Sequence, residues 1–493
     1  MKSVPTIRIR KCNDAPVRPG ANYVLYWMIA SRRLRHNFAL DRALKHCRAF
    51  RKPLMIFEAL RVDYPWASDR LHRFVLEGMT ANARYCESHG IRYLAYVEPA
   101  KGAGKGLLRA LAEDACVVVT DEFPCFFLPR MVASAAKQLK ILLEEVDSNG
   151  PLPLRSAGYV AQRAFDFRRY IQKELPKHLE HFPHAEPLAE VKLPKAPELC
   201  EKMLTKWPMA SDALLTGQPE ALVPLPIDHS VAPAKMRGGQ EAAHQQMQQF
   251  YSKKLGLYAE HRNEPEMDVA SGFSSYLHFG HLSVHEVFSE LAKREKWKTG
   301  KLAVRASGSR EGWWNMSPAA EGFLDELITW REVGYNFASQ RRDYDQYESL
   351  PDWARKTLKE HTTDEREWVY SLEEFEGAKT HDSLWNAAQT QLVREGRMLW
   401  GKKILEWSRT PQEAAKIMIQ LNNKYAVDGR NPNSYSGIFW VLGRYDRPWG
   451  PERPIFGKIR YMSSQNTARK VSVKEYVHKY CGAADSKQER FGF

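Results

Sequence analysis

The sequence predicts an α/β fold followed by an all-α fold. Residues 22–147 alternate short apolar runs with amphipathic segments, as strands and helices do around a parallel sheet. From about residue 234 to residue 480 the helical period dominates. A chain of 493 residues is too long for one hydrophobic core, so several domains are expected. We expect an α/β domain at 20–150, a proline-rich extended connector at 151–233 and a helical domain at 234–482.

Five short apolar runs are the expected strands of the first domain. The run at 23–29 is apolar throughout, which suits a buried strand. Amphipathic periods at 37–50 and 68–89 predict two of the intervening helices. The expected strands are 23–29, 53–57, 91–97, 115–120 and 141–146.

A glycine-rich turn, Lys-Gly-Ala-Gly-Lys-Gly at 101–106, invites comparison with a phosphate-binding loop. It lacks the G-x-x-x-x-G-K-[ST] spacing that places backbone N–H groups and a lysine around a phosphate. We therefore interpret it as a flexible turn.

The chain is basic and rich in aromatic residues. Lys and Arg number 73 against 59 Asp and Glu, a net charge of +14, which favours a polyanionic partner, although a merely basic surface explains the charge equally well. The chain also has 14 Trp and 21 Tyr, and the Trp residues are concentrated after residue 290. Stacking faces beside cations suit single-stranded or flipped-out bases, although core packing also uses Trp, so each tryptophan is considered separately.

The cysteines and the hydropathy indicate a soluble intracellular chain. The seven cysteines contain no C-x-x-C pair and read as reduced, mostly buried thiols. No apolar run is long enough to cross a bilayer, and the amino-terminal residues lack the apolar stretch of a secretion signal. We therefore expect a cytoplasmic monomer, associated with the nucleoid if the source is bacterial.

Two neighbouring segments carry groups suited to an anionic ligand. The first contains Tyr258, Arg262 and Asn263. The second precedes a helical run, where free backbone N–H groups and serine hydroxyls can hold an anion. Ordinary N-capping is the simpler explanation of those serines alone. The second segment consists of Ala270, Ser271, Gly272, Phe273 and Ser274.

Three histidines share a helix face at spacings of three, four and seven residues: His278, His281 and His285. No acidic or cysteine ligand lies in step with them. We interpret them as structural histidines and expect no metal.

Glu326 and Trp330 are four residues apart, so a carboxylate and an indole share one helix face. The adjacent apolar stripe is expected to desolvate Glu326 partly and to raise its pKa. Such a carboxyl can hydrogen-bond or protonate a base that bears a carbonyl group. A plain surface helix explains the following Arg331 and Glu332 well, and the Glu326–Trp330 pair less well.

Three tryptophans could form an electron-transfer series: Trp385, Trp400 and Trp407. The last two are seven residues apart, which predicts one helix face and two turns. A line of indoles can pass an electron stepwise because indole oxidises more readily than aliphatic side chains. Core packing is the more common explanation of helical tryptophans at this spacing.

The last part of the chain has a polar loop and then a cationic aromatic segment. Residues 421–440 are dense in amides and turn formers, including Asn422 and Asp428, which suits the edge of a polar cofactor. They carry no Ser–His–Asp order and no metal pattern, so hydrolysis by those routes has little support. Residues 440–462 combine Trp440 and Trp449 with a run of cations that includes Arg460, as a surface that stacks on planar groups beside a polyanion does.

Together these segments resemble the class II cyclobutane pyrimidine dimer photolyases of the photolyase/cryptochrome superfamily. Each motif is modest, but the ordered set is highly specific and spans nearly the whole chain. The resemblance implies a Rossmann-like α/β antenna domain at the amino terminus and a carboxy-terminal helical domain that holds a U-shaped FAD. The matching segments are 24–28, 36–40, 275–280, 380–389, 400–407, 428–430 and 456–462.

The resemblance implies a deoxyribodipyrimidine photo-lyase, a light-dependent carbon–carbon lyase. In this family the reduced FAD, when excited by light, gives an electron to a thymine dimer flipped out of double-stranded DNA, and the cyclobutane ring splits. A lesion weakens base pairing and lowers the cost of extrusion. A deazaflavin or a folate would be an optional second chromophore in the antenna domain.

Roles for individual residues also follow from the resemblance. Glu326 would bond the carbonyl oxygens of the dimer, Trp330 would lie beside dimer and flavin, and Asn422 would face N5 of the flavin. Further cofactor contacts are implied for Tyr258, Ala270, Ser271, Gly272, Phe273, Ser274, Asp428 and Arg397. Lesion or DNA contacts are implied for Arg262, Asn263, Met398, Trp440, Trp449 and Arg460, the last filling the hole left in the duplex. The electron-transfer series would be Trp385, Trp400 and Trp407, with Tyr370 as a companion.

One segment departs from the family pattern. Arg397-Met398 runs directly into Leu399-Trp400, where the family has about six more residues that end in Arg-Met. We assign the roles of the missing arginine and methionine to Arg397 and Met398. The departure leaves an alternative function open, a non-repairing DNA-binding flavoprotein or a cryptochrome-like blue-light sensor.

Overall fold

The computed structural model describes residues 3–396 and 400–482, and they form two compact units. Unit 1 comprises Met1–Gly158, Glu174–Gln248 and Gly272–Gly300. Unit 2 comprises Tyr159–Lys173, Gln249–Ser271 and Lys301–Phe493. The division differs from the expected boundaries, because residues 234–248 and 272–300 pack with the sheet-containing unit and residues 159–173 pack with the helical one.

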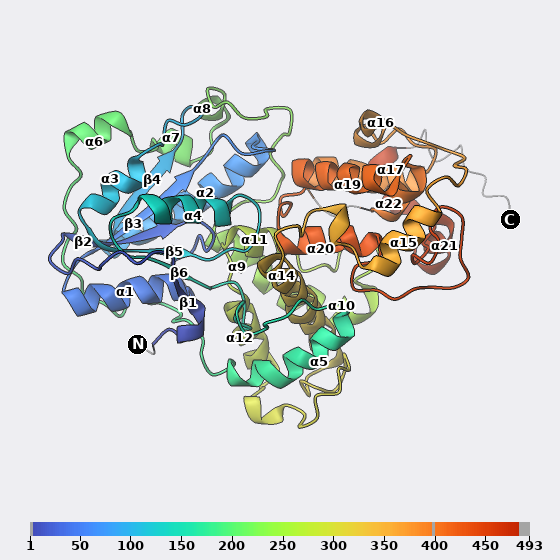
Figure 1. Ribbon diagram of the computed structural model, residues 1–493, viewed down its shortest axis with the longest axis horizontal. Helices are drawn as coiled ribbons and strands as arrows, with labels where there is room; N and C mark the ends of the chain where they lie inside the picture. The colour runs from blue at the N-terminus through green and yellow to red at the C-terminus, as the bar shows by residue number, and fades with distance from the viewer. Residues whose placement is uncertain (1–2, 397–399, 483–493) are drawn as a thin grey trace. The chain divides into compact units, whose positions relative to one another are not determined.

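Unit 1 contains a six-stranded sheet with strand order β1-β6-β5-β2-β3-β4 (Figure 1). Strands β2 to β6 are parallel, as expected for buried apolar runs separated by helices. A sixth strand, β1, which the sequence analysis does not predict, pairs antiparallel with β6 at one edge. The strands are β1 (Ile9–Lys11), β2 (Tyr23–Met28), β3 (Leu54–Leu60), β4 (Arg92–Val97), β5 (Ala115–Asp121) and β6 (Leu143–Val146).

The helices around the sheet begin and end at recognisable signals. Asn37 caps the first one, since its side chain accepts from the N–H groups of Ala39 and Leu40. Val24 and Leu40 lie in one buried cluster with residues of the neighbouring strands. Unit 1 contains α1 (Phe38–Phe50), α2 (Asp69–Ser88), α3 (Leu107–Glu113), α4 (Leu128–Gln138), α6 (Glu201–Lys206), α7 (Asp212–Leu215), α8 (Pro219–Leu222), α9 (Gln240–Gln249, whose last residue belongs to unit 2), α11 (Ser274–Phe279) and α12 (Val284–Arg294).

The glycine-rich turn at 101–106 is a turn, as interpreted. The N–H of Gly104 donates to Oε1 of Glu98 at 3.2 Å. A carboxylate inside the turn disfavours a phosphate at the same position, because like charges repel.

The connector contributes to the core of unit 1. Leu188 packs in the cluster around β2. Leu215, Leu222 and Leu225 pack in a second cluster with residues of α2 and β4. These leucines explain how a proline-rich segment with short helices is held in place without a core of its own.

Unit 2 is helical, and among the described residues every named strand lies in unit 1. Its main core includes Trp385, Trp407, Leu421 and Phe439. Its longer elements are α5 (Ala164–Glu174, whose last residue belongs to unit 1), α10 (Leu255–His261), α13 (Pro318–Leu324), α14 (Arg331–Gln340), α15 (Asp352–Glu360), α16 (Leu372–Glu376), α17 (Ser383–Glu395), α18 (Lys402–Trp407), α19 (Pro411–Tyr425), α20 (Pro432–Val441), α21 (Ser464–Lys470) and α22 (Lys474–Cys481).

Two segments of unit 2 are π-helical, namely η3 (Phe250–Lys254) and η5 (Asp325–Trp330). Such turns are rare, and they occur frequently at functional sites. The second one contains both residues of the predicted Glu326–Trp330 pair.

All seven cysteines are free thiols, as expected, and four of them are buried. Within residues 3–396 and 400–482, no helix combines the length and the apolar character that a membrane span requires.

Candidate active site

Glu326 lies in a cluster with two other predicted residues, Tyr258 and Arg262, from α10. Nε of Arg262 is 4.0 Å from Oε1 of Glu326, and the same guanidinium lies 5.9 Å from the centre of the Tyr258 ring. α10 and α13 pack together at Gly322, where an added Cβ would make ordinary van der Waals contact with Arg262 and Ala259 at 3.8 Å. We call Tyr258, Arg262 and Glu326 the Glu326 cluster.

The electrostatics of the Glu326 cluster make the Glu326 carboxyl harder to ionise than a carboxyl in water. Loss of hydration raises the pKa of Glu326, the charge of Asp325 raises it further, and Arg262 opposes both effects. Burial, together with the charge of Glu326, also raises the pKa of Tyr258. The Glu326 side chain is nevertheless 43% exposed, so a ligand can reach it. The predicted direction of the Glu326 pKa is confirmed.

Trp330 is half-buried at the last position of η5. The expected regular α-helix through Glu326 and Trp330 was wrong, because η5 is a π-helical segment between α13 and α14. Its wider turn changes the direction in which the two side chains point relative to α14.

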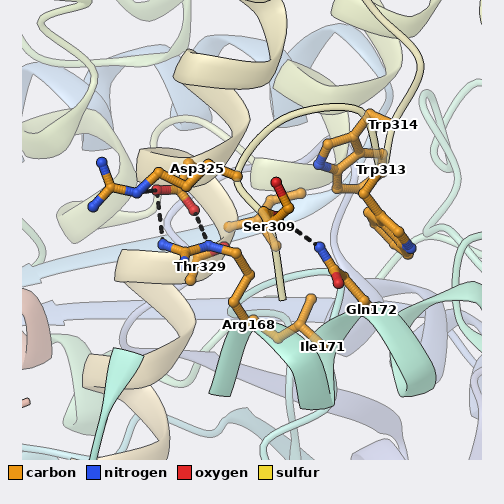
Figure 2. A pocket seen from close by; sticks show the side chains of 10 residues that line it. Arg168, Ile171, Gln172, Ser309, Trp313, Trp314, Asp325 and Thr329 are labelled. Carbon is orange, nitrogen blue, oxygen red and sulfur yellow. Dashed lines mark hydrogen bonds and ion pairs between the residues drawn. The ribbon is translucent and has the colours of Figure 1, made fainter. Parts of the chain in front are cut away.

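The neighbouring carboxylate, Asp325, has a different environment from that of Glu326 (Figure 2). Arg168 of α5 holds it through two hydrogen bonds, Nε to Oδ1 at 2.7 Å and Nη2 to Oδ2 at 3.0 Å. Arg310 lies 3.7 Å from Oδ2. Gln172 supports the same pocket by donating to the carbonyl of Ser309 at 2.9 Å. Asp325 is therefore committed to internal ion pairs, whereas Glu326 remains available to a ligand.

The Arg168–Asp325 pair should fix η5 and with it the position of Glu326. Both side chains are only 8% exposed. Removing one partner of a buried ion pair leaves a charge without compensation and costs about 3–5 kcal/mol. We expect Arg168→Met to lower the free energy of unfolding by about that amount, measured by urea denaturation.

The control for this prediction is the exposed pair of Arg163 and Asp166 near the same helix. Arg163 is 62% exposed, and exposed pairs contribute about 0–1 kcal/mol. Equal small losses for Arg163→Met and Arg168→Met would contradict the anchoring role of Arg168.

Asn422 lies in the last turns of α19 and is buried. Its Nδ2 donates to Oδ1 of Asn423 at 3.4 Å. Arg430 shapes the loop that follows, because its guanidinium donates to the carbonyls of Asn423, Ala426 and Val427. Arg430 has a φ of 62°, so backbone strain as well as hydrogen bonding defines this loop. Sequence reasoning missed this helix-capping arginine.

Buried amides in unit 2 provide a test of whether a flavin fits. Oε1 and Nε2 of Gln389, and Oδ1 of Asn433, are buried without a hydrogen-bond partner among the residues that the structure describes. Each such group costs about 1–3 kcal/mol when it stays unsatisfied. Amide donors and acceptors match a heterocycle whose edge alternates N–H and C=O groups, so the donor set fits the FAD ring system.

The helices that carry these amides are joined at their ends. The N–H of Val427, after α19, donates to the carbonyl of Gly396, after α17, at 3.3 Å. Nδ2 of Asn431 donates to the hydroxyl of Tyr335 in α14 at 3.4 Å. Since α14 continues from η5, the Glu326 segment and the Asn422 loop belong to one framework of packed helices.

The predicted tryptophan series is partly correct in its geometry. The rings of Trp385 and Trp407 are 6.0 Å apart and nearly perpendicular. Trp400 does not share the helix of Trp407, because α18 begins at Lys402. Trp400 contacts the series through its backbone, because Nε1 of Trp385 donates a hydrogen bond to the carbonyl oxygen of Trp400 at 2.9 Å. Tyr370 lies 5.7 Å from the Trp407 ring.

Four side chains near the carboxy terminus alternate indole and guanidinium groups. The Arg460 guanidinium lies 5.6 Å from the Trp440 ring and 4.3 Å from the Trp449 ring. Arg447 lies 4.6 Å from the Trp449 ring. Asp446 fixes the arrangement, since it accepts from Nε1 of Trp449 at 3.0 Å and pairs with Arg460 at 3.2 Å. We call Trp440, Arg460, Trp449 and Arg447 the cationic ladder.

The remaining predicted residues are less constrained. Asn263 and Ala270 are exposed, Ser271 and Asp428 are half-buried, and all four belong to unit 2. Unit 1 contains Gly272, Phe273 and Ser274. The N-cap position of α11 is occupied by Phe273 rather than by a serine, and no side chain there makes a capping hydrogen bond. N-capping by serine therefore does not explain this segment. Arg397 and Met398 lie outside the described residues.

The histidines at 278, 281 and 285 have the surroundings of packing residues. His281 stacks on Phe74 at 5.0 Å and accepts the N–H of Gly239 at Nδ1. Burial lowers the pKa of His281 to about 3, so the ring is neutral at physiological pH. Among the described residues, no group of three or more His, Cys, Asp or Glu side chains could hold a metal ion.

Comparisons with known proteins identify the family. The chain is 34% identical to the deoxyribodipyrimidine photo-lyase of Methanothermobacter thermautotrophicus, over 97% of this chain and 99% of that protein. It is 32% identical to the enzyme of the same name from Arabidopsis thaliana, over 95% of this chain and 91% of that protein. The chain belongs to the deoxyribodipyrimidine photo-lyase family. The enzyme class expected from the sequence, a light-dependent carbon–carbon lyase, is confirmed at this level.

Two other comparisons give different results. A comparison with models of protein families finds no match. The deoxyribodipyrimidine photo-lyase of Potorous tridactylus is 30% identical over 94% of this chain and 82% of that protein.

The photo-lyase fold is shared with solved structures of much lower identity. A bacterial class III photolyase from Agrobacterium tumefaciens aligns with a TM-score of 0.64 at 16% identity, over 93% of this chain and 86% of that one. A cryptochrome from Synechocystis aligns with a TM-score of 0.62 at 14% identity, over 97% and 89%. The predicted fold class, an α/β region followed by a helical region, is confirmed by these structures.

Proposed function

We propose that this photo-lyase family member is a class II enzyme that repairs cyclobutane pyrimidine dimers in double-stranded DNA, acting as a monomer with reduced FAD. The observation that carries the proposal is Glu326, which is 43% exposed and has a raised pKa beside Arg262. A protonated carboxyl in that position can donate a hydrogen bond to the carbonyl oxygen of a flipped-out pyrimidine. Its ion pair with Arg262 is long, at 4.0 Å, whereas Arg168 holds Asp325 through hydrogen bonds of 2.7 and 3.0 Å.

The residues of unit 2 would divide the work of binding. Gln389, Asn422 and Asn433 would satisfy the polar edge of the flavin ring, and Tyr258 and Ser271 would contact its ribityl and phosphate groups. Asp428 would lie in the same pocket. When bound, reduced FAD supplies the light-driven electron that splits the cyclobutane ring. The protein's own contribution is position and electrostatics.

Glu326 and Arg262 would act on the charge that the dimer gains. An added electron makes the carbonyl oxygens of a pyrimidine more basic and more negative. Hydrogen-bond donors that are already in place stabilise such developing charge without reorganisation. Glu326 would hold its proton at the carbonyl oxygen, and Arg262 would add positive charge nearby.

The cationic ladder would hold the DNA around the extruded lesion. Indoles stack on bases, and guanidinium groups neutralise phosphates. Arg460 lies between two indoles, where it could also occupy the space that the flipped nucleotide leaves in the duplex. A damaged pair costs less to open than an intact one, which favours extrusion of the dimer.

DNA affinity should fall steeply as salt concentration rises. Each arginine that contacts a phosphate contributes about 1 to the slope of log affinity against log salt concentration. We expect Arg460→Gln to reduce that slope by about 1, measured by fluorescence anisotropy over a salt series. Arg355→Gln serves as the control, because Arg355 pairs with Asp352 on α15 outside the ladder. An unchanged slope for Arg460→Gln would remove Arg460 from the interface.

The alternative is a DNA-binding flavoprotein that senses blue light without repair. The direct junction of Arg397-Met398 with Leu399-Trp400 favours it, because the family has about six more residues there. An absorption spectrum of the purified protein tests for flavin. Illumination of the reduced protein with dimer-containing DNA then separates the two functions, since repair restores pyrimidine absorbance and a sensor leaves it unchanged.

A further inference from the structure

The aromatic series in unit 2 continues beyond the tryptophans to the protein surface. The Trp407 ring lies 5.7 Å from Tyr370 and 5.0 Å from His381. Trp368 stacks on His381 at 4.7 Å, with 25° between the rings. Exposure rises from 1% at Trp385 and 2% at Trp407 to 9% at Tyr370 and 44% at Trp368. The series therefore leads from the core to solvent.

The Tyr370 hydroxyl has a base at hydrogen-bond distance. Its oxygen is 2.7 Å from Nδ1 of His381, and it also accepts the backbone N–H of His381 at 3.0 Å. In the tautomer of His381 that carries its hydrogen on Nε2, Nδ1 is free to accept the hydroxyl hydrogen of Tyr370. A phenol loses an electron readily only when its proton leaves at the same time, and Nδ1 of His381 is positioned to take that proton.

The charges around the series favour movement of positive charge outward. Nζ of Lys403 lies 5.2 Å from the Trp407 ring, so a positive charge on that indole is disfavoured, although Glu406 pairs with Lys403 at 2.7 Å and weakens the effect. Burial raises the pKa of Tyr370, and the charges of Glu374 and Asp382 raise it further. The same two carboxylates would stabilise an imidazolium at His381.

Tyr370 is the companion of the tryptophan series that the family resemblance implies. We propose that His381 takes its hydroxyl proton when Tyr370 gives an electron to Trp407, and that Trp368 is the surface position at which an external thiol supplies the replacing electron. The inference rests on the proposed function, because the electron vacancy on Trp407 arises when light-excited oxidised flavin has drawn an electron through the tryptophans.

Each step balances in electrons and protons. The Trp407 radical cation takes one electron from Tyr370 and becomes neutral. The hydroxyl proton of Tyr370 moves to Nδ1 of His381, which leaves a neutral tyrosyl radical and an imidazolium. A thiolate at Trp368 then gives one electron and becomes a thiyl radical. The proton returns from His381, and the O–H bond of Tyr370 forms again.

A pulse-radiolysis experiment on the full-length protein in the dark tests the relay without using flavin photochemistry. Azide radicals oxidise exposed tryptophans, and Trp368 is the exposed end of the series. We expect tyrosyl absorbance to rise as tryptophanyl absorbance decays, and to rise more slowly in D₂O. Tyr370→Phe should lose this phase, whereas Tyr461→Phe, which removes a more exposed hydroxyl, should keep it.

His381 is tested by removal and chemical rescue. His381→Ala should lose the tyrosyl phase, and imidazole added to the buffer should restore it, which a purely structural role would not produce. His381→Gln, which keeps a polar side chain, is the second variant if alanine destabilises the loop. A tyrosyl phase that survives in Tyr370→Phe, or that is unchanged in both His381 variants, would overturn the proposal.

Thiol-driven photoreduction of the bound flavin tests the role of Trp368. Trp368→Phe should slow it, and Trp353→Phe, which changes a tryptophan at the edge of the same core, should not. Equal rates in both variants would remove Trp368 from the relay. A tyrosyl phase in the dark with no DNA repair would reject the proposed function and support the relay. DNA repair without a Tyr370-dependent tyrosyl phase would support the proposed function and reject the relay.

Discussion

Glu326→Ala is expected to abolish most DNA repair while FAD remains bound. Removing one hydrogen-bond donor from a site of developing charge costs roughly 10²- to 10³-fold in rate. The Glu326 side chain is 43% exposed, and its ion pair with Arg262 is long, at 4.0 Å. Its loss should therefore not unfold the helices around the flavin. The measurement is the single-turnover repair rate of a dimer-containing oligonucleotide, beside the flavin absorbance of the same sample.

The pH dependence of repair distinguishes a protonated Glu326 from an ionised one. Its pKa is raised above the ordinary value, so the neutral form is present below that raised pKa and is lost as pH rises through it. The repair rate should fall over the same interval. Glu326→Gln should remove this dependence, since an amide donates a hydrogen at every pH.

Glu260→Gln is the matched control, because Glu260 lies on α10 with a side chain that is 83% exposed. A pH profile that is the same in wild type and Glu326→Gln would contradict the assigned role. Loss of flavin from Glu326→Ala would do so as well, since it would place Glu326 in the cofactor framework instead.

Trp385→Phe is expected to remove most photoreduction of oxidised flavin and to retain repair by chemically reduced protein. Trp385 is 1% exposed, and it joins the backbone of Trp400 to the ring of Trp407. A phenyl ring is much harder to oxidise than an indole and lacks the Nε1 hydrogen. The measurement is flavin bleaching under blue light with a thiol donor, followed by repair after dithionite reduction.

Trp353→Phe provides the control, because it makes the same change at the edge of the same hydrophobic core. Unchanged bleaching in Trp385→Phe would exclude the tryptophan series as the route to flavin. Loss of both bleaching and dithionite-supported repair would indicate a structural role for Trp385.

Local sequence patterns predict the elements that depend on local burial. Strand β2 is a continuous apolar run, β3 and β5 are mostly apolar, and α1 begins at a capping asparagine, so these elements follow from neighbouring residues. Strand β1 has three residues, two of them charged, and forms only because β6 pairs with it. Nothing in its own sequence distinguishes it from a loop.

The candidate site shows the same division between local and distant causes. The raised pKa of Glu326 follows from its apolar neighbours, and the sequence predicts it. The partner of Asp325 is Arg168, 157 positions away, and no local pattern connects them. Trp400 falls outside the helix of Trp407 because α18 begins after Gly401, which residue spacing alone does not reveal. Trp368 and His381 lie on loops, and only the fold brings their rings together.

The most direct test of light-driven repair uses a duplex with one thymine dimer at a defined position. The dithionite-reduced protein is mixed with this DNA so that protein is in excess over duplex, and the mixture is exposed to one period of blue light. The damaged strand is then analysed by chromatography and compared with the strand from a sample kept in the dark. We expect the illuminated sample to contain the intact dithymidine strand and the dark sample to contain only the dimer. Binding of the duplex with no conversion in the light, by protein that carries reduced flavin, would contradict the account.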